Sequence, residues 1–570
     1  MIKKRQNNKT SLFFRLFILT GCLIITCLIG FSTFALITKG NFDTFFGGRG
    51  VISDVPVPPQ DRETIIITKD SHDVVIQSGY NYVFQGSEYF GTKDYPIHLD
   101  GIFSQIDIHQ GVAQNPLDAY IDGDNNYFWI NKSWNEGIQG VFGVLSGTIV
   151  NFNLMGIITH SETSVAMAAI LEAEGILYNC NNYIDISSYD HNGYSAGLVG
   201  ELKGKIIKCN NYGRITANGY ASGIAYKITG SITGSSNYGN IISTSSKAAG
   251  IAGTVIGSVK DSQNLANVEG NLGAAGVAIE VTGGSLIGCI NGNQNKKINI
   301  YSSSAYSVGI VYNLKSVDEN TGKISKCINY SDINGNSGAA GIGYYINGNI
   351  EESHNYGDIT SHSKAIGIAR KVQGNITKTN NFGSVFGAND YSVGIVLEME
   401  GDLVDCQNSG FISTSDGSAS GIVYNIIGNI TRAKNTGKVQ KTGWGGNKYV
   451  TGIASIAYGV ISDSINNGQV IVENVASYMG GIAGRMTGQI LNSESNGKIK
   501  QNNPYMPVTI GGITAVLHSD AQLGTPLIKD CIVTGGLQIW SLLADKHIIA
   551  FSFPSDSIQN CVGMGKLYNL

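Results

Sequence analysis

The sequence predicts an all-β protein whose main part is a single-chain parallel β-helix. Three observations predict this fold: a glycine-marked repeat of 26 or 27 residues, three short apolar runs in each repeat, and a composition rich in glycine and poor in charge. We expect about 14 coils with three strands per coil, preceded by one N-terminal transmembrane helix. Right-handed coiling is expected because parallel crossovers nearly always have that hand.

Three glycines mark each repeat. Two of them are nine residues apart, as in Gly204 and Gly213, and the third opens a Gly-Ile or similar pair seven residues before the next repeat, as in Gly223 and Gly230. The apolar runs between the glycines have four to six residues and alternate with period two, which favours strands over helices. Such a unit buries its apolar face only against the next unit, so the repeats from 140 to 570 predict a stacked solenoid.

The composition excludes two classes of protein. Only 14% of the residues are charged and the net charge is −4, so we expect no nucleic-acid partner. Hydrophobic residues make up 42% of the chain, which is not typical of disorder. The 75 glycines and only 9 prolines fit an all-β chain with many turns.

The first forty residues carry an export signal. Residues 16–38 form an apolar run, longer than the roughly 20 residues that span a bilayer, after a basic segment at 1–15. We therefore expect a signal-anchor helix at 16–38, a cytoplasmic segment at 1–15, and a cell-membrane protein with an extracellular C-terminal domain. Cleavage of a signal peptide near Ala35 would secrete the chain instead, and a lipobox-like LTGC ending at Cys22 is a third interpretation.

The remaining boundaries follow from composition. Residues 39–100, with their VPVPPQ stretch, predict a stalk and an N-terminal cap. Residues 101–139 are expected to form lead-in strands, and the β-helix domain is expected at 140–570.

Seven of the nine cysteines fall in one column of the repeat, where serine, threonine and alanine replace them in other repeats. A residue exchanged so freely is a small buried core residue rather than a nucleophile or metal ligand, so we predict no metal and no cofactor. The stacked pairs Cys180/Cys209 and Cys531/Cys561 leave room for an occasional disulfide. The column is Cys180, Cys209, Ser235, Ser262, Cys289, Cys327, Ser353, Thr379, Cys406, Ala433, Ser464, Ser493, Cys531 and Cys561.

A column of asparagines follows two residues later. Asparagine tolerates the left-handed conformation of turns, and stacked amides hydrogen-bond to one another, so we expect a ladder at a corner of the coil. Tyrosines follow the asparagines in several repeats and are expected to stack on the outer surface, with a ligand platform as the alternative. The asparagines are Asn182, Asn211, Asn237, Asn264, Asn291, Asn329, Asn355, Asn381, Asn408, Asn435 and Asn466.

The stretch GVFGVLSGTIVNFNLMGII at 140–158 resembles the GLUG-type repeat of bacterial surface proteins, and DGIFSQIDIH at 100–109 resembles the segment that often precedes it. The resemblance covers roughly residues 100–535. It implies an adhesin-like β-helix on a cell surface. Similar repeats are found in the non-catalytic N-terminal parts of IgA-cleaving zinc peptidases, but this chain has no HExxH motif.

No catalytic constellation is recognisable. Glycoside cleavage needs two carboxylates about 5–10 Å apart, whereas the 42 acidic residues are scattered. Glu201, Glu280 and Glu398 share one position of the repeat with lysine, asparagine and arginine, which is typical of a solvated face. We therefore predict a non-enzyme, with a polysaccharide lyase or hydrolase of β-helix type as the alternative.

Three insertions lengthen the repeat, at 293–309, 437–452 and 497–512, and we expect all three at the same corner. Insertions in solenoids form loops on one face, and such loops often bind ligands. Their aromatic side chains suit sugar rings or a partner protein, although variable loops with chance aromatics are the alternative. The candidate binding residues are Tyr301, Tyr306, Trp444, Tyr449 and Tyr505.

These observations predict a non-catalytic extracellular adhesion or interaction rod. Its partners would be the membrane, through the N-terminal helix, and a glycan or a protein of a host or neighbouring cell. A structural component of a surface layer or filament is a further alternative.

Overall fold

The structure is a computed structural model that describes residues 55–99, 106–108, 110–134, 140–160, 163–318, 321–503, 508–519, 526–539, 545–547, 549–551, 557–563 and 567–569. The chain divides into two compact units, residues 1–57 and 58–570. The predicted basic segment at 1–15 and transmembrane helix at 16–38 lie outside the described residues. Within the described residues, no helix has the length and apolarity needed to span a bilayer.

Each regular coil of the second unit has three faces, as predicted, but five short strands rather than three. Gly204 divides the strand run of the first face, and a bend at Gly213 divides that of the second face. One coil consists of β17 (Val199–Leu202) and β18 (Lys205–Ile207) on the first sheet, β19 (Asn210–Asn211) and β20 (Ile215–Ala217) on the second, and β21 (Tyr220–Ser222) on the third.

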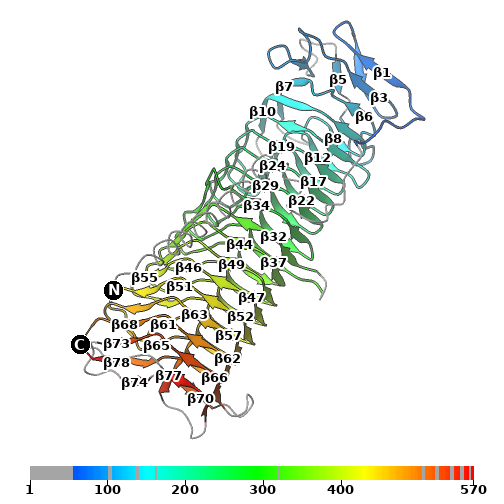
Figure 1. Ribbon diagram of the computed structural model, residues 1–570. Coiled ribbons are helices and arrows are strands. Elements are labelled where there is room, and N and C mark those ends of the chain that lie inside the picture. Colours follow the sequence, from blue (N-terminus) through cyan, green and yellow to red (C-terminus); the bar gives the residue numbers. More distant parts are fainter. Residues whose placement is uncertain are drawn as a thin grey trace, which may run out of the picture. The chain divides into compact units, whose positions relative to one another are not determined.

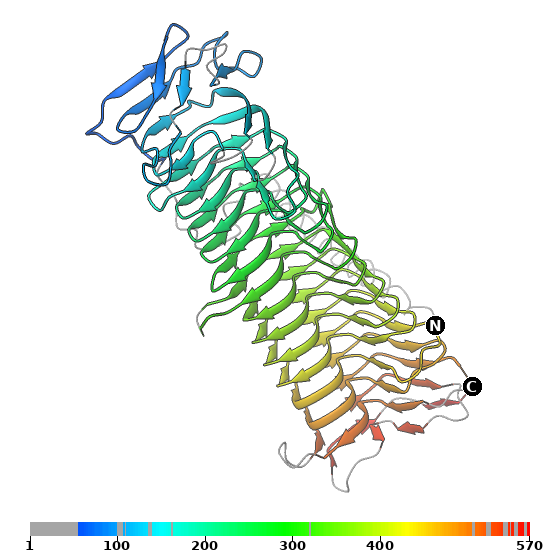
Figure 2. The same cartoon turned by 180° about the vertical axis from the view of Figure 1, so that it is seen from behind.

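Equivalent strands of successive coils pair in parallel, which confirms the predicted parallel β-helix. The described strands form two 31-stranded sheets, a 14-stranded sheet and a separate pair, β2 (Val74–Ile76) with β5 (Ile106–Ile108). Figures 1 and 2 show the coils lying side by side from β10 (Asn153–His160) to β70 (Thr514–His518). The handedness of the coiling stays a prediction.

The stack has about 16 turns, so the expected count of about 14 is slightly too low. The glycine pattern does not extend towards the N-terminus beyond residue 140, so the count from the sequence began there. In the structure, strands before residue 140 already belong to the first sheet. These strands are β1 (Thr64–Ile67), β3 (Asn81–Phe84) and β6 (Tyr120–Asp122), which pair in succession and lead to β9 (Thr148–Val150).

The third sheet contributes one short strand per coil. Its described members are β11 (Ser164–Val165), β16 (Tyr194–Ala196), β21, β26 (Lys247–Ala249), β31 (Gly273–Ala275), β36 (Tyr306–Val308), β41 (Gly338–Ala340), β46 (Lys364–Ile366), β51 (Tyr391–Val393), β56 (Ser418–Ser420), β61 (Tyr449–Thr451), β65 (Tyr478–Gly480), β69 (Thr509–Gly511) and β74 (Asp545–His547).

The cysteine column lies in the interior, as predicted: every member except Cys561 is at most 1% exposed. Side chains of the column also accept hydrogen bonds from backbone N–H groups at the corner between the first and second sheets. The N–H of Cys209 donates to the Oγ of Ser235 in the next coil at 3.1 Å, and that of Cys180 donates to the Sγ of Cys209 at 3.3 Å. A small side chain with an acceptor atom is therefore favoured at this position, which explains the exchange among cysteine, serine and threonine.

The left-handed residue of this corner precedes the cysteine column, so the expectation that the asparagine column adopts this conformation is wrong. Lys208, Asp261 and Glu352 have φ of 55°, 47° and 47°, whereas Asn211 lies in the extended strand β19. The corner tolerates lysine, aspartate and glutamate, which gave no signal in the sequence.

The predicted asparagine ladder is confirmed. All eleven asparagines are fully buried. The Nδ2 of every one before Asn466 donates to the Oδ1 of the next asparagine over 2.7–3.0 Å. Most Nδ2 groups also donate to the carbonyl two residues ahead, as Asn355 does to Gly357 at 2.8 Å. An amide that lost these partners in the interior would cost about 1–3 kcal/mol, so the ladder holds the coils in register.

The Gly-Ile glycines make room for this ladder. A Cβ on Gly341 would lie 2.1 Å from the carbonyl oxygen of Gly367 and 2.5 Å from the Cγ of Asn355. The glycine column and the asparagine column therefore pack directly against each other.

Candidate functional site

The five predicted binding aromatics do not form one cluster. Tyr301 lies on the outer face of the second sheet and is 38% exposed, whereas Trp444 lies in the loop before β61 and is 63% exposed. Tyr306 and Tyr449 begin strands β36 and β61 of the third sheet and are half-buried. Tyr505 lies outside the described residues.

The expectation that the three insertions share one corner is wrong for the first of them. Its extra residues fall mainly between β34 (Ile290–Asn291) and β35 (Asn299–Ser302), which places them in the bend of the second sheet. The second falls between β60 (Val439–Lys441) and β61, and the third between β68 (Ile499–Gln501) and β69, at the corner of the second and third sheets. The sequence showed that the repeat was longer but not which strand gap had grown.

The loop that carries Trp444 is held by the coil beneath it. The Oδ1 of Asp416 accepts the backbone N–H of Gly445 at 3.0 Å, and this contact lowers the pKa of the carboxyl group. Lys441, whose side chain is fully buried, donates from Nζ to the carbonyl of Gly443 at 2.8 Å. The exposed indole therefore sits on a backbone that is ordered before any ligand arrives.

A second aromatic surface, which we call the tyrosine seam, lies where the outer faces of the third and first sheets meet. Tyr194 stacks on Tyr226 with ring centroids 4.1 Å apart, and Tyr306 lies against Tyr344 at 3.8 Å. Further pairs join Tyr391 to Tyr424 at 4.5 Å and Tyr449 to Tyr478 at 4.9 Å. Tyr306 and Tyr449 thus belong to the seam.

Glycines in neighbouring strands leave the space that these rings occupy. A Cβ on Gly338 would lie 2.0 Å from the Cε1 of Tyr306, and one on Gly484 would lie 2.6 Å from the Cδ1 of Tyr449. Tyr344 is only 8% exposed, although it points outward from its sheet. Side chains of the two sheets therefore interlock along the seam and cover an apolar layer that is separate from the main core.

The sequence carries a signal for the seam that went unread. Tyrosine stands three residues before the Gly-Ile glycine in several repeats, and in some of them another tyrosine stands three residues after it, as in YASGIAY and YSVGIVY. The first tyrosine stands at the start of the third-sheet strand. The second stands near the start of the following first-sheet strand, on its outer face. This spacing could have predicted that the two columns meet.

Cationic side chains lie over the seam's rings. The Nζ of Lys247 is 4.6 Å from the ring centre of Tyr312, and the guanidinium of Arg370 is 4.7 Å from that of Tyr345. Burial raises the pKa of Tyr312 to about 12, so its phenol stays protonated at neutral pH. Burial also lowers the pKa of Lys247, against an opposing effect of Glu280. The seam therefore offers aromatic edges, phenol hydroxyls and cations on one strip.

The tyrosines that follow the asparagine ladder stack on the outer face of the second sheet, as predicted. Tyr183, Tyr212 and Tyr238 form a run with centroid distances of 4.7 and 4.8 Å and nearly parallel planes. Tyr356 and Phe382 form a second such pair at 4.7 Å. Their planes face one another, so the stack turns mainly ring edges outward.

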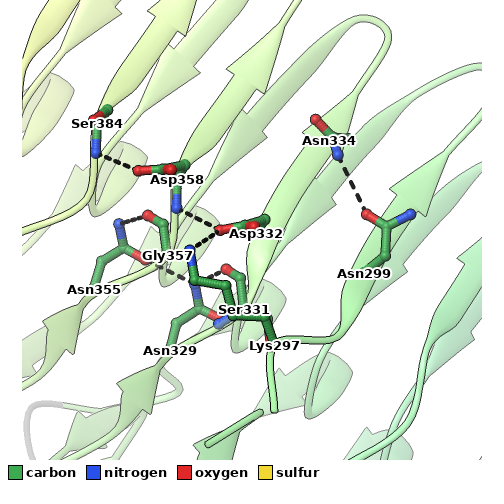
Figure 3. A network of polar contacts seen from close by, with 10 residues as sticks. All are labelled: Lys297, Asn299, Asn329, Ser331, Asp332, Asn334, Asn355, Gly357, Asp358 and Ser384. Atoms are coloured by element: carbon green, nitrogen blue, oxygen red, sulfur yellow. Dashed lines mark hydrogen bonds and ion pairs between the residues drawn. The ribbon is translucent and has the colours of Figure 1, made fainter. Parts of the chain in front are cut away.

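Several acidic side chains have structural partners. Figure 3 shows Asp332, whose Oδ1 accepts the backbone N–H of Asp358 at 2.9 Å and the Nζ of Lys297 at 2.8 Å. The Oδ1 of Asp358 accepts the N–H of Ser384 at 2.8 Å in the next coil. Such carboxylates continue the backbone pairing across a bend.

Two members of the acidic column on the first sheet also lie close to cations. Glu201 lies 3.4 Å from Lys227, and Glu398 lies 3.6 Å from Arg370. Glu400 is on the same strand as Glu398, but a hydrogen bond from Gln373 and the charge of Lys371 lower the pKa of its carboxyl group. A general acid of glycoside cleavage needs a raised pKa, so Glu400 is poorly suited to that role.

The thiols of Cys180 and Cys406 are not activated. Burial raises the pKa of Cys406 to about 12, and burial is also the main cause of the raised pKa of Cys180. In the part of the chain that the structure describes, no group of three or more histidine, cysteine, aspartate or glutamate side chains could hold a metal ion.

Comparisons with known proteins found no match: no protein-family model, no curated protein and no solved structure is similar to this chain.

Proposed function

We propose that this chain is a non-catalytic interaction solenoid that binds a glycan or a protein through the Trp444 loop. The observation that carries the proposal is an indole 63% exposed on a loop whose backbone is fixed by Asp416 and Lys441. An exposed aromatic is costly to leave in water, and an ordered loop loses little conformational entropy on binding. Large aromatics on such loops are typical of binding hot spots.

The proposal includes display outside the cell. The apolar run at 16–38, with Lys3, Lys4, Arg5, Lys9 and Arg15 before it, supports an anchor that exports the solenoid. The resemblance of residues 140–158 to GLUG-type repeats supports an adhesin-like role on a bacterial surface.

The test incubates the purified protein with a panel of polysaccharides and cell-surface proteins, and follows both retention of the ligand and release of oligosaccharides. Retention without release is expected, and Trp444→Ala should weaken it about tenfold or more, the loss typical of an aromatic anchor. Tyr189→Ala is the matched control, because Tyr189 is 73% exposed after the second-sheet strand of another coil.

Released fragments would show an enzyme and overturn the non-catalytic part of the proposal. Equal binding by the Trp444 and Tyr189 variants would overturn the role of the loop.

A further inference from the structure

On the first-sheet side of the tyrosine seam, four polar side chains each hold a buried atom that has no hydrogen-bond partner among the residues the structure describes. They are the Oδ1 of Asn313, the Nε of Arg370, the Oδ1 of Asn425 and the Nε of Arg485. Buried polar atoms in proteins are nearly always paired, so four unpaired ones along one strip need an explanation.

These four side chains recur at every second coil. Asn313 pairs with Tyr345 of the next coil, and Tyr345 pairs with Lys371, the residue that follows Arg370. From Lys371 the same pairing leads to Glu398 and then Asn425. Two further coils on, by way of Ile456, it reaches Arg485. With coils about 4.8 Å apart, the unpaired groups repeat about every 9.6 Å over a span of about 29 Å.

The four groups are of two kinds that alternate. The asparagine oxygens of Asn313 and Asn425 accept hydrogen bonds, whereas the guanidinium groups of Arg370 and Arg485 donate them. All four side chains are half-buried, so part of each reaches the surface. A rotation of an asparagine amide would bring its unpaired oxygen outward.

We infer that the tyrosine seam binds one linear glycan chain that lies along the solenoid axis. Sugar hydroxyls both donate and accept, so a single polymer with a regular repeat can satisfy the asparagines and the arginines in turn. A proline-rich peptide has a similar repeat, about 9.3 Å in polyproline II geometry, but proline lacks the N–H that the asparagine oxygens need. The ring of Tyr345 lies on this register and is 40% exposed, so it offers apolar surface that a sugar ring can cover.

Arg485 adds a preference within this class. Within the part of the chain that the structure describes, it has no ion pair or hydrogen bond. It lies beside Tyr449 and His518, where its charge lowers the pKa of the histidine as a secondary cause after burial. Arg370, in contrast, already lies 3.6 Å from Glu398. A carboxylate on the glycan would find its partner at Arg485.

This inference rests on the proposed function and names the ligand class and a second contact surface. The experiment titrates the purified protein by calorimetry with linear oligosaccharides of increasing length, prepared from xylan, cellulose and polygalacturonate. Affinity should rise with chain length until the ligand spans about 29 Å, and then level off. Asn425→Ala should bind about threefold to tenfold more weakly, the loss expected for one hydrogen bond.

Arg485→Met should weaken binding of the acidic oligosaccharide more than that of the neutral ones. Asn192→Ala and Arg214→Met are matched controls on exposed positions outside the seam and should bind as the unaltered chain does. Because the buried Oδ1 of Asn425 has no hydrogen-bond partner among the described residues, its loss should not lower the melting temperature, which checks that the variant is folded.

An affinity that does not depend on length, or seam variants that bind like their controls, would overturn the inference. If Trp444→Ala then still abolished retention, the proposed function would stand without the seam. Binding of a proline-rich peptide in place of every oligosaccharide would also overturn the inference, whereas retention of no ligand at all would overturn both proposals.

Discussion

The interior of the second sheet and the tyrosine seam differ in how completely their polar side chains are hydrogen-bonded. Inside, each ladder amide is bonded to the next coil, and a glycine of the neighbouring face leaves space for it. On the seam, Asn313 and Asn425 occupy equally regular positions, yet the Oδ1 of each has no partner in the described part of the chain. The same residue type in the same repeat thus serves the fold in one place and is left available in the other.

This difference separates structural from functional residues without any comparison to relatives. A buried amide that is fully bonded contributes to stability, and its loss is felt in folding. A buried amide without a partner costs stability and is therefore a candidate for contact with something outside the chain.

The largest effect is expected from breaking the ladder. Asn355→Ala removes the bond from Asn329 and the bond to Asn381, and it leaves a cavity in the core. We expect a loss of about 2–4 kcal/mol in the free energy of unfolding, to be measured by urea denaturation. A midpoint like that of the unaltered chain would show that the ladder carries little stability.

A smaller, pH-dependent effect is expected from Lys441. Burial lowers the pKa of its ammonium group to about 8, below the value of about 10.4 in an unfolded chain. The folded state therefore binds fewer protons between these two values, and stability should rise from about pH 8 upward. The melting temperature should increase between pH 7.5 and 9.5.

The control for this effect is Lys441→Met, which keeps an unbranched apolar chain in the interior and removes the titrating group. Its melting temperature should be level over the same pH range. A parallel rise in both proteins would assign the pH dependence to other groups.

The smallest effect on stability is expected on the seam. Asn425→Ala removes an amide whose buried oxygen has no partner among the described residues, so the free energy of unfolding should stay level or rise by at most about 1 kcal/mol. The same substitution at Asn355 and at Asn425 thus forms a matched pair, compared by urea denaturation. Equal losses at both sites would contradict the distinction between ladder and seam.

The sequence predicted the interior better than the surface, for a physical reason. The columns of Cys209 and Asn211 repeat because each coil meets an identical neighbour, so position in the repeat alone shows that they stack. The left-handed corner residue was missed because a lone residue such as Lys208 is held there by its surroundings rather than by its own preference.

The site was only partly predictable. The exposure of Trp444 followed from its place in an insertion, but the support from Asp416 comes from the preceding coil and has no sequence signature. The seam joins two faces that are separated by a turn, so its contacts, such as that of Tyr306 with Tyr344, are set by the way one coil lies on another.

The asparagine ladder also bears on how such a chain can change length in evolution. Because every rung bonds to an identical rung, gaining or losing one whole coil leaves the ladder intact and demands no compensating change elsewhere. The seam is less tolerant, since its unpaired groups recur at every second coil. Duplications and deletions of coil pairs would keep those groups in phase, whereas a single coil gained or lost between Asn313 and Arg485 would put the two halves of the strip out of step.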